Sequence, residues 1–381
     1  MSVIGIPVIF TGDHWIGGLN YYMSLISTLT MAPQSDFKFV IITNKPGVLD
    51  RFISESVSIH VDESLGKNSI AQKIINKFFD CDLKLVRVVN LLNIDLLTHT
   101  TYSKKYRCKT IWWKPDFQEQ YYPEFFSKRE LWERKRAVER NAKHASIIFS
   151  SQNACDDYHQ FYKEKCHSYV LNFVPLLDLH TIDEEKVQSV LDKYNIKSPF
   201  FYLPNQFWVH KNHELVLQSI IQRNHDLDFE VISTGVMKDY RGQGHIEKIK
   251  KLIEQIPDNK FRTLGLVPRE DMLALMHASL AVINPSKFEG WSTTVEEAKY
   301  SGKRIILSSL PVHKEQCPPD SIFIDIDDIE AMSDAIRHIL NSYNIEKENE
   351  RRRAAEVCYK RDRLEFSLNY FKIIRKELSR C

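Results

Sequence analysis

Residues 280–309 read LAVINPSKFEGWSTTVEEAKYSGKRIILSS. The apolar run LAVIN is typical of a buried strand, and a second apolar run, RIIL, begins shortly after Gly302. Between the two runs, hydroxyl residues followed by glutamates indicate the start of a helix, with Thr293 or Thr294 as the capping residue and Gly302 at the C′ position. The stretch therefore predicts a strand, a helix and a second strand, which is the repeating unit of an α/β sheet.

The same alternation runs along most of the chain. After the first strand comes a segment with apolar residues at helical spacing, namely Leu19, Tyr22, Met23, Ile26 and Leu29. We expect strands within residues 3–10, 37–43, 57–61, 95–100, 109–113, 145–151, 168–174, 199–205, 228–234, 260–265, 280–286, 303–309 and 322–326. Strands separated by helices favour parallel sheets that are covered by helices on both faces.

The alternation pauses near Pro175 and then resumes as a second series. A chain of 381 residues is longer than one hydrophobic core usually supports. We therefore expect two doubly wound, Rossmann-like α/β domains that face each other across a cleft, over residues 1–175 and 176–360. Residues 361–381 are expected to form a C-terminal helix that packs back on the first domain.

Composition disfavours several classes of protein. The hydrophobic fraction of 43% and the net charge of +2 are those of an ordinary globular protein with no pull toward nucleic acid. Seven scattered cysteines without a CxxC pair argue against a zinc site or a disulfide framework. No signal peptide and no run of about 18 apolar residues is found, so we expect a cytoplasmic protein.

Glu289 and Glu297 are the candidates for chemistry in the opening stretch. A carboxylate accepts hydrogen bonds from neighbouring hydroxyls, and the N–H groups at a helix start bind phosphate. Two carboxylates on either side of such N–H groups would fit a ribose, a diphosphate and a sugar. The alternative is that acidic residues merely favour the start of the helix dipole, and we assign this role to Glu296.

The segment PSKFEGWSTTVEEAKYSGKRIILSSLPVHKEQ, residues 285–316, resembles the nucleotide-sugar signature of glycosyltransferase family 4, whose members are retaining enzymes of the GT-B fold. The resemblance covers most of the chain and is strongest from Phe200 to Asp327. It implies that Glu289 contacts the donor sugar and that Glu297 binds the ribose hydroxyls. It also implies a donor site lined by Gly290, Trp291, Ser292, Thr293 and Thr294.

The segment YLPNQFWVHKNH, residues 202–213, resembles the part of the family that binds pyrophosphate. Lys211 aligns with the family's lysine, whereas Gln206 stands where an arginine is common. Asn205, Gln206 and His210 are expected to replace that arginine in part. Further candidates for the donor site are Gly235 at a strand end, Arg241 as a second phosphate cation, and Leu266 and Val267 beside the base.

The first half contributes Gly17 and Gly18, which we expect to precede the first helix and to lie beside the donor phosphates. Many relatives carry a histidine at or near the segment WWKPDFQEQYYPEFFSKRE, whereas this chain has none between His99 and His144. Asp116 is therefore our candidate for a residue on the sugar side.

The basic segment SKRELWERKRAVERNAK, residues 127–143, follows directly, with aromatic residues close by. Such a helix can rest on an anionic bilayer, or it can be a solvated face with ion pairs four residues apart. Both interpretations remain open at this point.

The resemblance implies a retaining, metal-independent hexosyltransferase with no cofactor. Its first domain would hold the acceptor and its second the nucleotide-sugar donor. The expected acceptor is a glycan or lipid-linked glycan, in the assembly of a cell-surface polysaccharide or lipopolysaccharide. Alternatives are a sugar-nucleotide epimerase or hydrolase of the same fold and a non-catalytic partner subunit. A nicotinamide-dependent dehydrogenase is disfavoured because the GxGxxG fingerprint is missing.

Overall fold

The computed structural model describes residues 1–10, 16–31, 36–79, 81–178, 182–224, 227–239, 241–242, 244–257 and 260–380. The chain forms two compact units. The first unit comprises residues 1–121, 127–176 and 361–381, and the second comprises residues 122–126 and 177–360. Within the described part of the chain, no helix is both long enough and apolar enough to cross a bilayer.

A parallel sheet with the strand order β3-β2-β1-β4-β5-β6-β7 forms the centre of the first unit. Its strands are β1 (Ser2–Val8), β2 (Phe37–Thr43), β3 (Val57–Val61), β4 (Leu96–Thr98), β5 (Lys109–Lys114), β6 (Ser146–Phe149) and β7 (His167–Val170). Its helices are α1 (Ile16–Thr28), α2 (Ile70–Phe79), α3 (Leu83–Leu91), α4 (Gln118–Tyr121), α5 (Lys128–His144) and α6 (Gln152–Phe161), with a short 3₁₀ helix η1 (Asp50–Phe52).

The second unit has its own parallel sheet, with the order β10-β9-β8-β11-β12-β13. Its strands are β8 (Phe200–Leu203), β9 (Glu230–Ser233), β10 (Phe261–Thr263), β11 (Ala281–Asn284), β12 (Ile305–Ser308) and β13 (Ile322–Ile324). Its helices are α7 (Glu184–Lys193), α8 (His213–Ser219), α9 (His245–Ile253), α10 (Arg269–Ala278), α11 (Thr293–Tyr300), α12 (Pro311–Gln316) and α13 (Ile329–Ser342). Short helices are η2 (Pro123–Phe125), η4 (Val209–Lys211) and the π-helical η5 (Ile220–Asn224).

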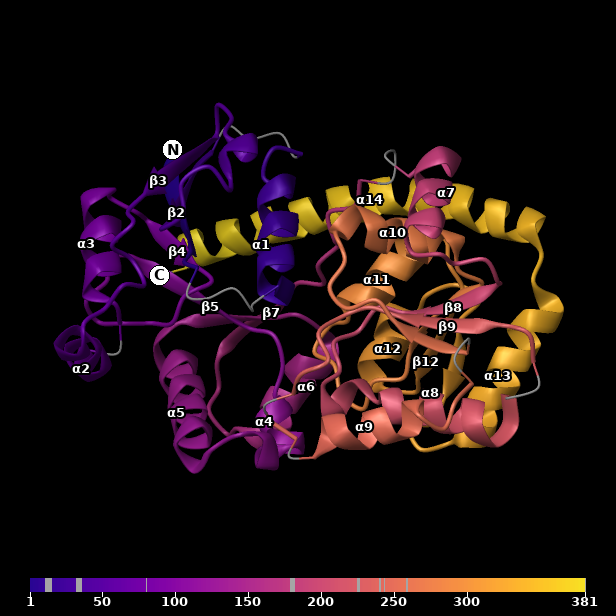
Figure 1. Ribbon diagram of the computed structural model, residues 1–381. Helices are drawn as coiled ribbons and strands as arrows, with labels where there is room; N and C mark the ends of the chain where they lie inside the picture. The colour runs from indigo at the N-terminus through magenta and orange to yellow at the C-terminus, as the bar shows by residue number, and fades with distance from the viewer. Residues whose placement is uncertain are drawn as a thin grey trace. The chain divides into compact units, whose positions relative to one another are not determined.

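Each strand overlaps a segment that the sequence predicts as a strand, and β1, β5 and β7 extend one residue beyond the predicted range. The expectation of two doubly wound α/β domains is confirmed, since both sheets are parallel and carry helices between most successive strands. Figure 1 shows the helices that accompany each sheet.

Alternation along the strands of the second unit divides its core into two layers. Phe201 and Val231 pack in the cluster that includes α8, α9 and α13, whereas their neighbours Tyr202 and Ile232 pack in the cluster that includes α7, α10 and α11. All four side chains are fully buried. Successive residues of a strand point to opposite faces, so both faces of this sheet need apolar residues, which explains the unbroken apolar runs in the sequence.

Helix α14 (Ile345–Ser379) ends the described chain, and its residues from Arg361 onward belong to the first unit. There the Tyr370 hydroxyl lies 2.8 Å from the Thr98 hydroxyl, and the Phe371 ring packs edge-on against Phe39 at 5.5 Å. The apolar residues of this segment are thus part of the core around the first sheet.

The face of α1 differs from its prediction. Tyr21 and Leu25 are fully buried together with Tyr22, Ile26 and Leu29, whereas Leu19 and Met23 are only half-buried. The buried stripe is therefore rotated by about one position, because Tyr21 stacks on Trp113 at 3.9 Å within the same unit. The spacing of apolar residues within α1 does not reveal that the Tyr21 ring packs against a residue of β5.

The turn after α11 brings α14 close to β12. Gly302 has a φ of +68°, as expected for a C′ glycine, and a Cβ placed there would lie 2.6 Å from the backbone N and Cα of Arg352. The next residue, Lys303, is fully buried, and its ammonium lies 2.7 Å from the Glu348 carboxylate. Burial lowers the pKa of Lys303 to about 8.

We expect Gly302→Ala to destabilise the second unit because its methyl group would overlap the α14 backbone. Gly265→Ala is the matched control: Gly265 has a φ of +69°, and no atom of the described residues lies within 4 Å of the Cβ built there. Both variants carry the same left-handed strain. The free energy of unfolding in urea should fall by about 1–3 kcal/mol more for Gly302→Ala, the usual cost of overpacking. Equal losses of unfolding free energy in the two variants would contradict the close contact between Gly302 and the α14 backbone.

Candidate functional site

The loop after β11 places the carboxylate of Glu289 between two donors. Its Oε1 lies 2.6 Å from the Lys211 ammonium and 2.7 Å from the Ser286 hydroxyl. The side chains of Lys211 and Glu289 are 14% and 10% exposed. No hydrogen bond or ion pair from a described residue reaches Oε2 of Glu289. One oxygen is therefore fixed, and the other is available to accept a hydrogen bond from a ligand.

The position of Lys211 depends on Asn212, which follows it. Asn212 has a φ of +57°, a conformation that asparagine tolerates better than most residues. Its amide donates to the carbonyl of Pro285 at 3.1 Å and to that of Ile326 at 2.8 Å. The loop after β8 is thereby tied to the loops that follow β11 and β13.

The Glu289 carboxyl is charged at neutral pH. Burial acts to raise its pKa, but the ammonium of Lys211 and the hydrogen bond from it lower the pKa below its ordinary value. The buried histidines nearby stay neutral, since burial lowers the pKa of His210 to about 3 and also lowers the pKa of His313. The local charge is thus mainly that of one ion pair.

Glu297 lies further along, inside α11, and its side chain is buried. Its Oε1 is 2.8 Å from the Arg269 guanidinium, which comes from the first turn of α10. Each of the two candidate carboxylates is therefore paired with a cation from a different loop or helix. Position 289 is in a loop and position 297 is in a helix, as the sequence predicts.

The start of α11 differs from the predicted capping pattern. Thr293 is already the first helical residue, and the N-cap residue Ser292 makes no side-chain hydrogen bond to the first turn. The Ser292 hydroxyl instead accepts from the Asn284 amide at 2.9 Å. The prediction that Thr293 or Thr294 caps the helix is wrong, because a residue eight positions earlier recruits the true N-cap. The first-turn N–H groups thus lack a side-chain acceptor from the N-cap and form the positive end of the helix.

Glu296 lies in the first turn of α11, as predicted for an acidic residue that favours the helix start, and it has a further role. Its side chain is buried, and its carboxylate accepts from the Gln316 amide at 2.9 Å. The same Gln316 contacts both backbone groups of Ser292, accepting from its N–H at 3.2 Å and donating to its C=O at 2.9 Å. Glu296 therefore holds α12 against the start of α11.

A chain of polar contacts supports this site, and most of its members were missed by sequence reasoning. The Asn205 amide donates to Asn284 Oδ1 at 3.1 Å, and the Ser286 hydroxyl lies 2.9 Å from that oxygen. The single hydrogen of Ser286 can be donated either there or to Glu289. The available signal was a polar residue at the end of each apolar run, which places its side chain at the carboxyl edge of the sheet.

Gly235 marks a close approach between loops. Its φ is +124°, and a Cβ there would lie 2.7 Å from the Asn205 carbonyl oxygen and 2.8 Å from the Gln206 Cα. Its N–H donates to the Gly265 carbonyl at 2.8 Å. The loops after β8, β9 and β10 are thus in contact, which brings Asn205, Gln206 and Gly235 together.

The remaining candidates of the second unit lie on the same loops. Leu266 is exposed and Val267 is half-buried, just before α10. The Arg241 guanidinium lies 5.3 Å from the Trp208 ring and 5.7 Å from the Phe126 ring. Gly290 and Trp291 are half-buried between Glu289 and the helix, and Thr294 is buried.

Three candidates belong to the first unit. Gly17 and Gly18 lie inside the first turn of α1 and do not precede it, which corrects the predicted helix start. Most of the loop before them falls outside the described residues. Asp116 is half-buried, and its Oδ1 accepts from the backbone N–H of Gln118 at 3.0 Å, at the start of α4.

The described residues contain no group of three or more His, Cys, Asp or Glu side chains arranged to hold a metal ion. What the second unit does offer is two oriented carboxylates, one lysine and a helix start, all at the carboxyl edge of a parallel sheet. This is the edge at which open α/β sheets bind ligands.

Residues 186–359 match the family model described as glycosyl transferases group 1. No curated protein sequence matches the chain. Among solved structures, a glycosyltransferase from Rickettsia africae ESF-5 is 16% identical with a TM-score of 0.69, covering 99% of this chain and 98% of its own. Anabaena Alr3699/HepE in complex with UDP-glucose is 14% identical with a TM-score of 0.72, over 99% and 100%.

WaaG, a glycosyltransferase involved in lipopolysaccharide biosynthesis, is 11% identical with a TM-score of 0.64, and the match covers 93% of this chain and 95% of that one. At such identities the likeness concerns the fold. The chain thus shares its fold, with one parallel sheet in each of two Rossmann-like domains, with these solved structures.

The buried histidines predict a pH dependence of stability. Burial lowers the pKa of both His210 and His213 to about 3. An unfolded histidine takes up a proton as the pH falls through about 6.5, whereas these two stay neutral in the folded state. The unfolded state then binds more protons, so the free energy of unfolding falls as the pH drops below about 6.5. Each histidine contributes up to about 1.4 kcal/mol per pH unit.

The measurement is urea unfolding between pH 7.5 and 5, where carboxylates with ordinary pKa values stay charged. His213→Gln removes one titrating group, so its slope should be shallower than that of the wild type by about 1 kcal/mol per pH unit. Identical slopes in both proteins would show that His213 is protonated in the folded state.

Proposed function

We propose that this protein is a retaining glycosyltransferase of family 4, which moves a hexose from a nucleoside diphosphate sugar to a hydroxyl of a glycan. The observation that carries this proposal is the pair of oriented carboxylates, Glu289 and Glu297, one on each side of the start of α11. The match of residues 186–359 to group 1 glycosyl transferases supports the same activity.

The donor would lie along α11. The first-turn N–H groups and Lys211 would bind the diphosphate, since both present positive charge to an anion. Glu297 would accept hydrogen bonds from the ribose hydroxyls, and Glu289 would use Oε2 to accept one from the donor sugar. The complex of Anabaena HepE with UDP-glucose supports a donor of this class.

Lys211 can serve the diphosphate without leaving Glu289. An ammonium group has three hydrogens, and the contact with Glu289 uses one of them. The remaining two can be donated to phosphate oxygens. Glu289 would therefore hold the lysine in place while the charge of the leaving group develops.

In the transfer step, the bond between the anomeric carbon and the diphosphate oxygen breaks, and a bond from that carbon to the acceptor oxygen forms on the same face. The acceptor proton passes to the departing diphosphate, so no side-chain nucleophile takes part. Lys211 and the helix N–H groups stabilise the charge on the leaving oxygen. We propose that this step needs neither a metal ion nor another cofactor.

The first unit would hold the acceptor, and we keep Asp116 as its candidate near the donor sugar and Gly17 and Gly18 as its candidates beside the donor phosphates. A glycan or lipid-linked glycan acceptor in cell-surface polysaccharide or lipopolysaccharide assembly is supported by the fold shared with WaaG. We propose a cytoplasmic location, and the basic helix α5 supports a peripheral contact with an anionic membrane.

The first test is donor binding. The melting temperature of the purified protein is measured with UDP-, GDP-, ADP-, CMP- and dTDP-sugars, in EDTA. One nucleotide class should stabilise the wild type by about 2–3 kcal/mol at 100 times its dissociation constant. Glu297→Ala should lose most of this shift because the ribose loses its acceptor. Absence of any shift at millimolar concentration would contradict the proposal.

The second test is turnover by Lys211→Gln, followed as release of nucleoside diphosphate. Loss of the cation at the leaving group should lower kcat about 10²–10³-fold, the usual effect of removing one stabilising donor. Lys248→Gln is the control, since Lys248 is exposed and pairs with Glu214 at 2.6 Å on α8. The anomeric configuration of the product, read by NMR, tests retention. Equal activity of both variants would rule out the role of Lys211.

A further inference from the structure

The short helix α12 carries two buried polar side chains, His313 and Gln316. They are three residues apart and therefore lie on the same side of the helix. Gln316 contacts both backbone groups of Ser292, at the end of the loop between β11 and α11. His313 was not identified as a site residue from the sequence, and its contacts lead to the start of the same loop.

The imidazole of His313 is fixed through Nδ1. This nitrogen lies 2.9 Å from the carbonyl oxygen of Ser308, the last residue of β12. The backbone N–H of Leu310 donates to the same carbonyl at 2.8 Å, so both lone pairs of that oxygen are used. Burial lowers the pKa of His313, so the ring is neutral, and its hydrogen must be on Nδ1 because a carbonyl can only accept. His313 thus closes the turn between β12 and α12.

The hydroxyl of Ser308 connects this turn to the loop that carries Glu289. It donates to the backbone carbonyl of Ser286. The Ser286 hydroxyl lies 2.7 Å from Oε1 of Glu289, and the same oxygen accepts from Lys211 at 2.6 Å. A series of polar contacts therefore runs from His313 through Ser308 and Ser286 to Glu289.

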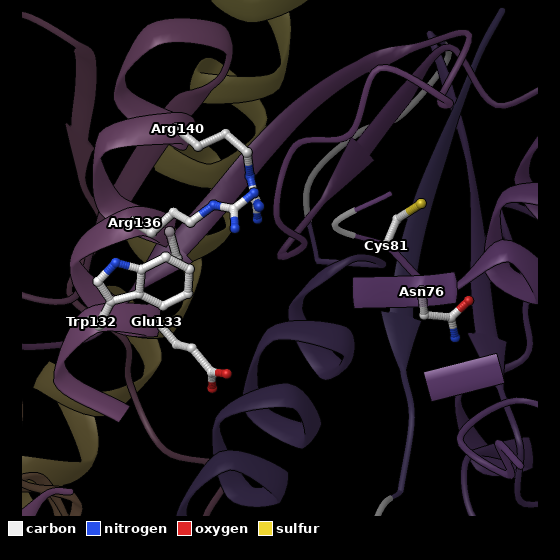
Figure 2. Close-up of a pocket in the computed structure, with 7 residues that line it drawn as sticks. Asn76, Cys81, Trp132, Glu133, Arg136 and Arg140 are labelled. Atoms are coloured by element: carbon white, nitrogen blue, oxygen red, sulfur yellow. The ribbon is translucent and has the colours of Figure 1, made fainter. Parts of the chain in front are cut away.

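The first three residues of this series contact other protein groups and not solvent, because His313, Ser308 and Ser286 are fully buried. By contrast, the cavity of about 380 Å³ beside α5 in the first unit has room for a small molecule (Figure 2). Nε2 of His313 has no hydrogen-bond partner in the described part of the chain. Since a buried nitrogen without a partner lowers stability, stability alone does not account for a histidine at this position.

We propose that His313 is a positioning residue for Glu289, acting through Ser308 and Ser286 on the loop after β11. Loss of the Nδ1 donor would release the turn after β12 and, with it, the hydroxyl that holds the Ser286 carbonyl. Glu289 would then be displaced from the position in which Oε2 meets the donor sugar. The effect on transfer rests on the proposed function, whereas the effect on the loop does not.

Two variants separate the hydrogen bond from the space that the ring fills. H313L has an apolar side chain without a donor. H313N keeps a donor, because Nδ2 of asparagine occupies the same place in its side chain as Nδ1 of histidine. Both are expected to fold, since the Ser308 carbonyl keeps the N–H of Leu310 as a partner. H277L is the matched control, because His277 lies near the C-terminal end of α10, the opposite end from Arg269.

The first measurement is hydrogen–deuterium exchange of the unliganded protein, which needs no substrate. The N–H of Lys287 donates to the carbonyl of His210 at 2.7 Å, so its exchange reports opening of the loop. In H313L, peptides that cover residues 285–292 should exchange at least about fivefold faster than in the wild type. In H313N and H277L, their exchange should stay within about twofold of the wild type.

The second measurement is turnover with the sugar nucleotide of the class that stabilises the wild type in the melting-temperature screen. H313L should lower kcat/KM about 10²-fold, because a small displacement of an orienting group slows the reaction strongly. H313N should recover most of this activity. The affinity of H313L for the same nucleotide without its sugar should stay within about twofold of the wild type, since Gln316 still holds Ser292 at the helix start.

The proposal is overturned if either the exchange or the turnover of H313L matches that of the wild type, or if H277L produces the same changes. It is also overturned if H313L loses affinity for the nucleotide as strongly as it loses turnover, since His313 would then support the unit as a whole. A wild type that neither binds nor turns over a sugar nucleotide would contradict the proposed function. The exchange of H313L would still show whether His313 holds the loop.

Discussion

Parallel pairing of strands is the constraint on which both units depend. When every strand runs in the same direction, all carboxyl ends meet at one edge, and each return to the other edge needs a crossover connection, which usually contains a helix. In the second unit, the loops at that edge contact one another. The loops after β8, β9 and β10 contact each other through Gly235, while Asn212 ties the loops after β8, β11 and β13 together. The candidate site residues are thus placed by contacts between the loops at this edge.

The two candidate carboxylates are each balanced by a positively charged side chain. Glu289 is paired with Lys211, and Glu297 is paired with Arg269. Each of these two carboxylates therefore has a nearby cation. Such pairs offset the cost of burying charge, which a lone carboxylate could not do. In the donor complex that we propose, the diphosphate would contact the helix start and would share Lys211 with Glu289. The proposed binding would therefore add phosphate contacts to a lysine that the Glu289 carboxylate already holds in place.

The strands could be predicted from sequence because both faces of each sheet are buried, and the resulting apolar runs are local signals. The positions of Glu289 and Glu297 in a loop and a helix also followed from local pattern. The start of α11 did not, because Asn284 recruits the Ser292 hydroxyl through a contact between loops. The roles of Gln316 and Ser286 depend likewise on which loops meet, and no spacing rule reports that.

The division of α14 between the two units has a consequence for biosynthesis. Residues 361–380 contribute Tyr370 and Phe371 to the core around the first sheet, although they are synthesised after residues 177–360. The first unit therefore stays incomplete until residues 361–380 have been synthesised, whereas residues 177–360 form almost all of the second unit and emerge earlier. Domains usually fold in the order of synthesis. In this chain the second unit can fold before the first, and the contacts of Tyr370 with β4 and of Phe371 with β2 can form only afterwards.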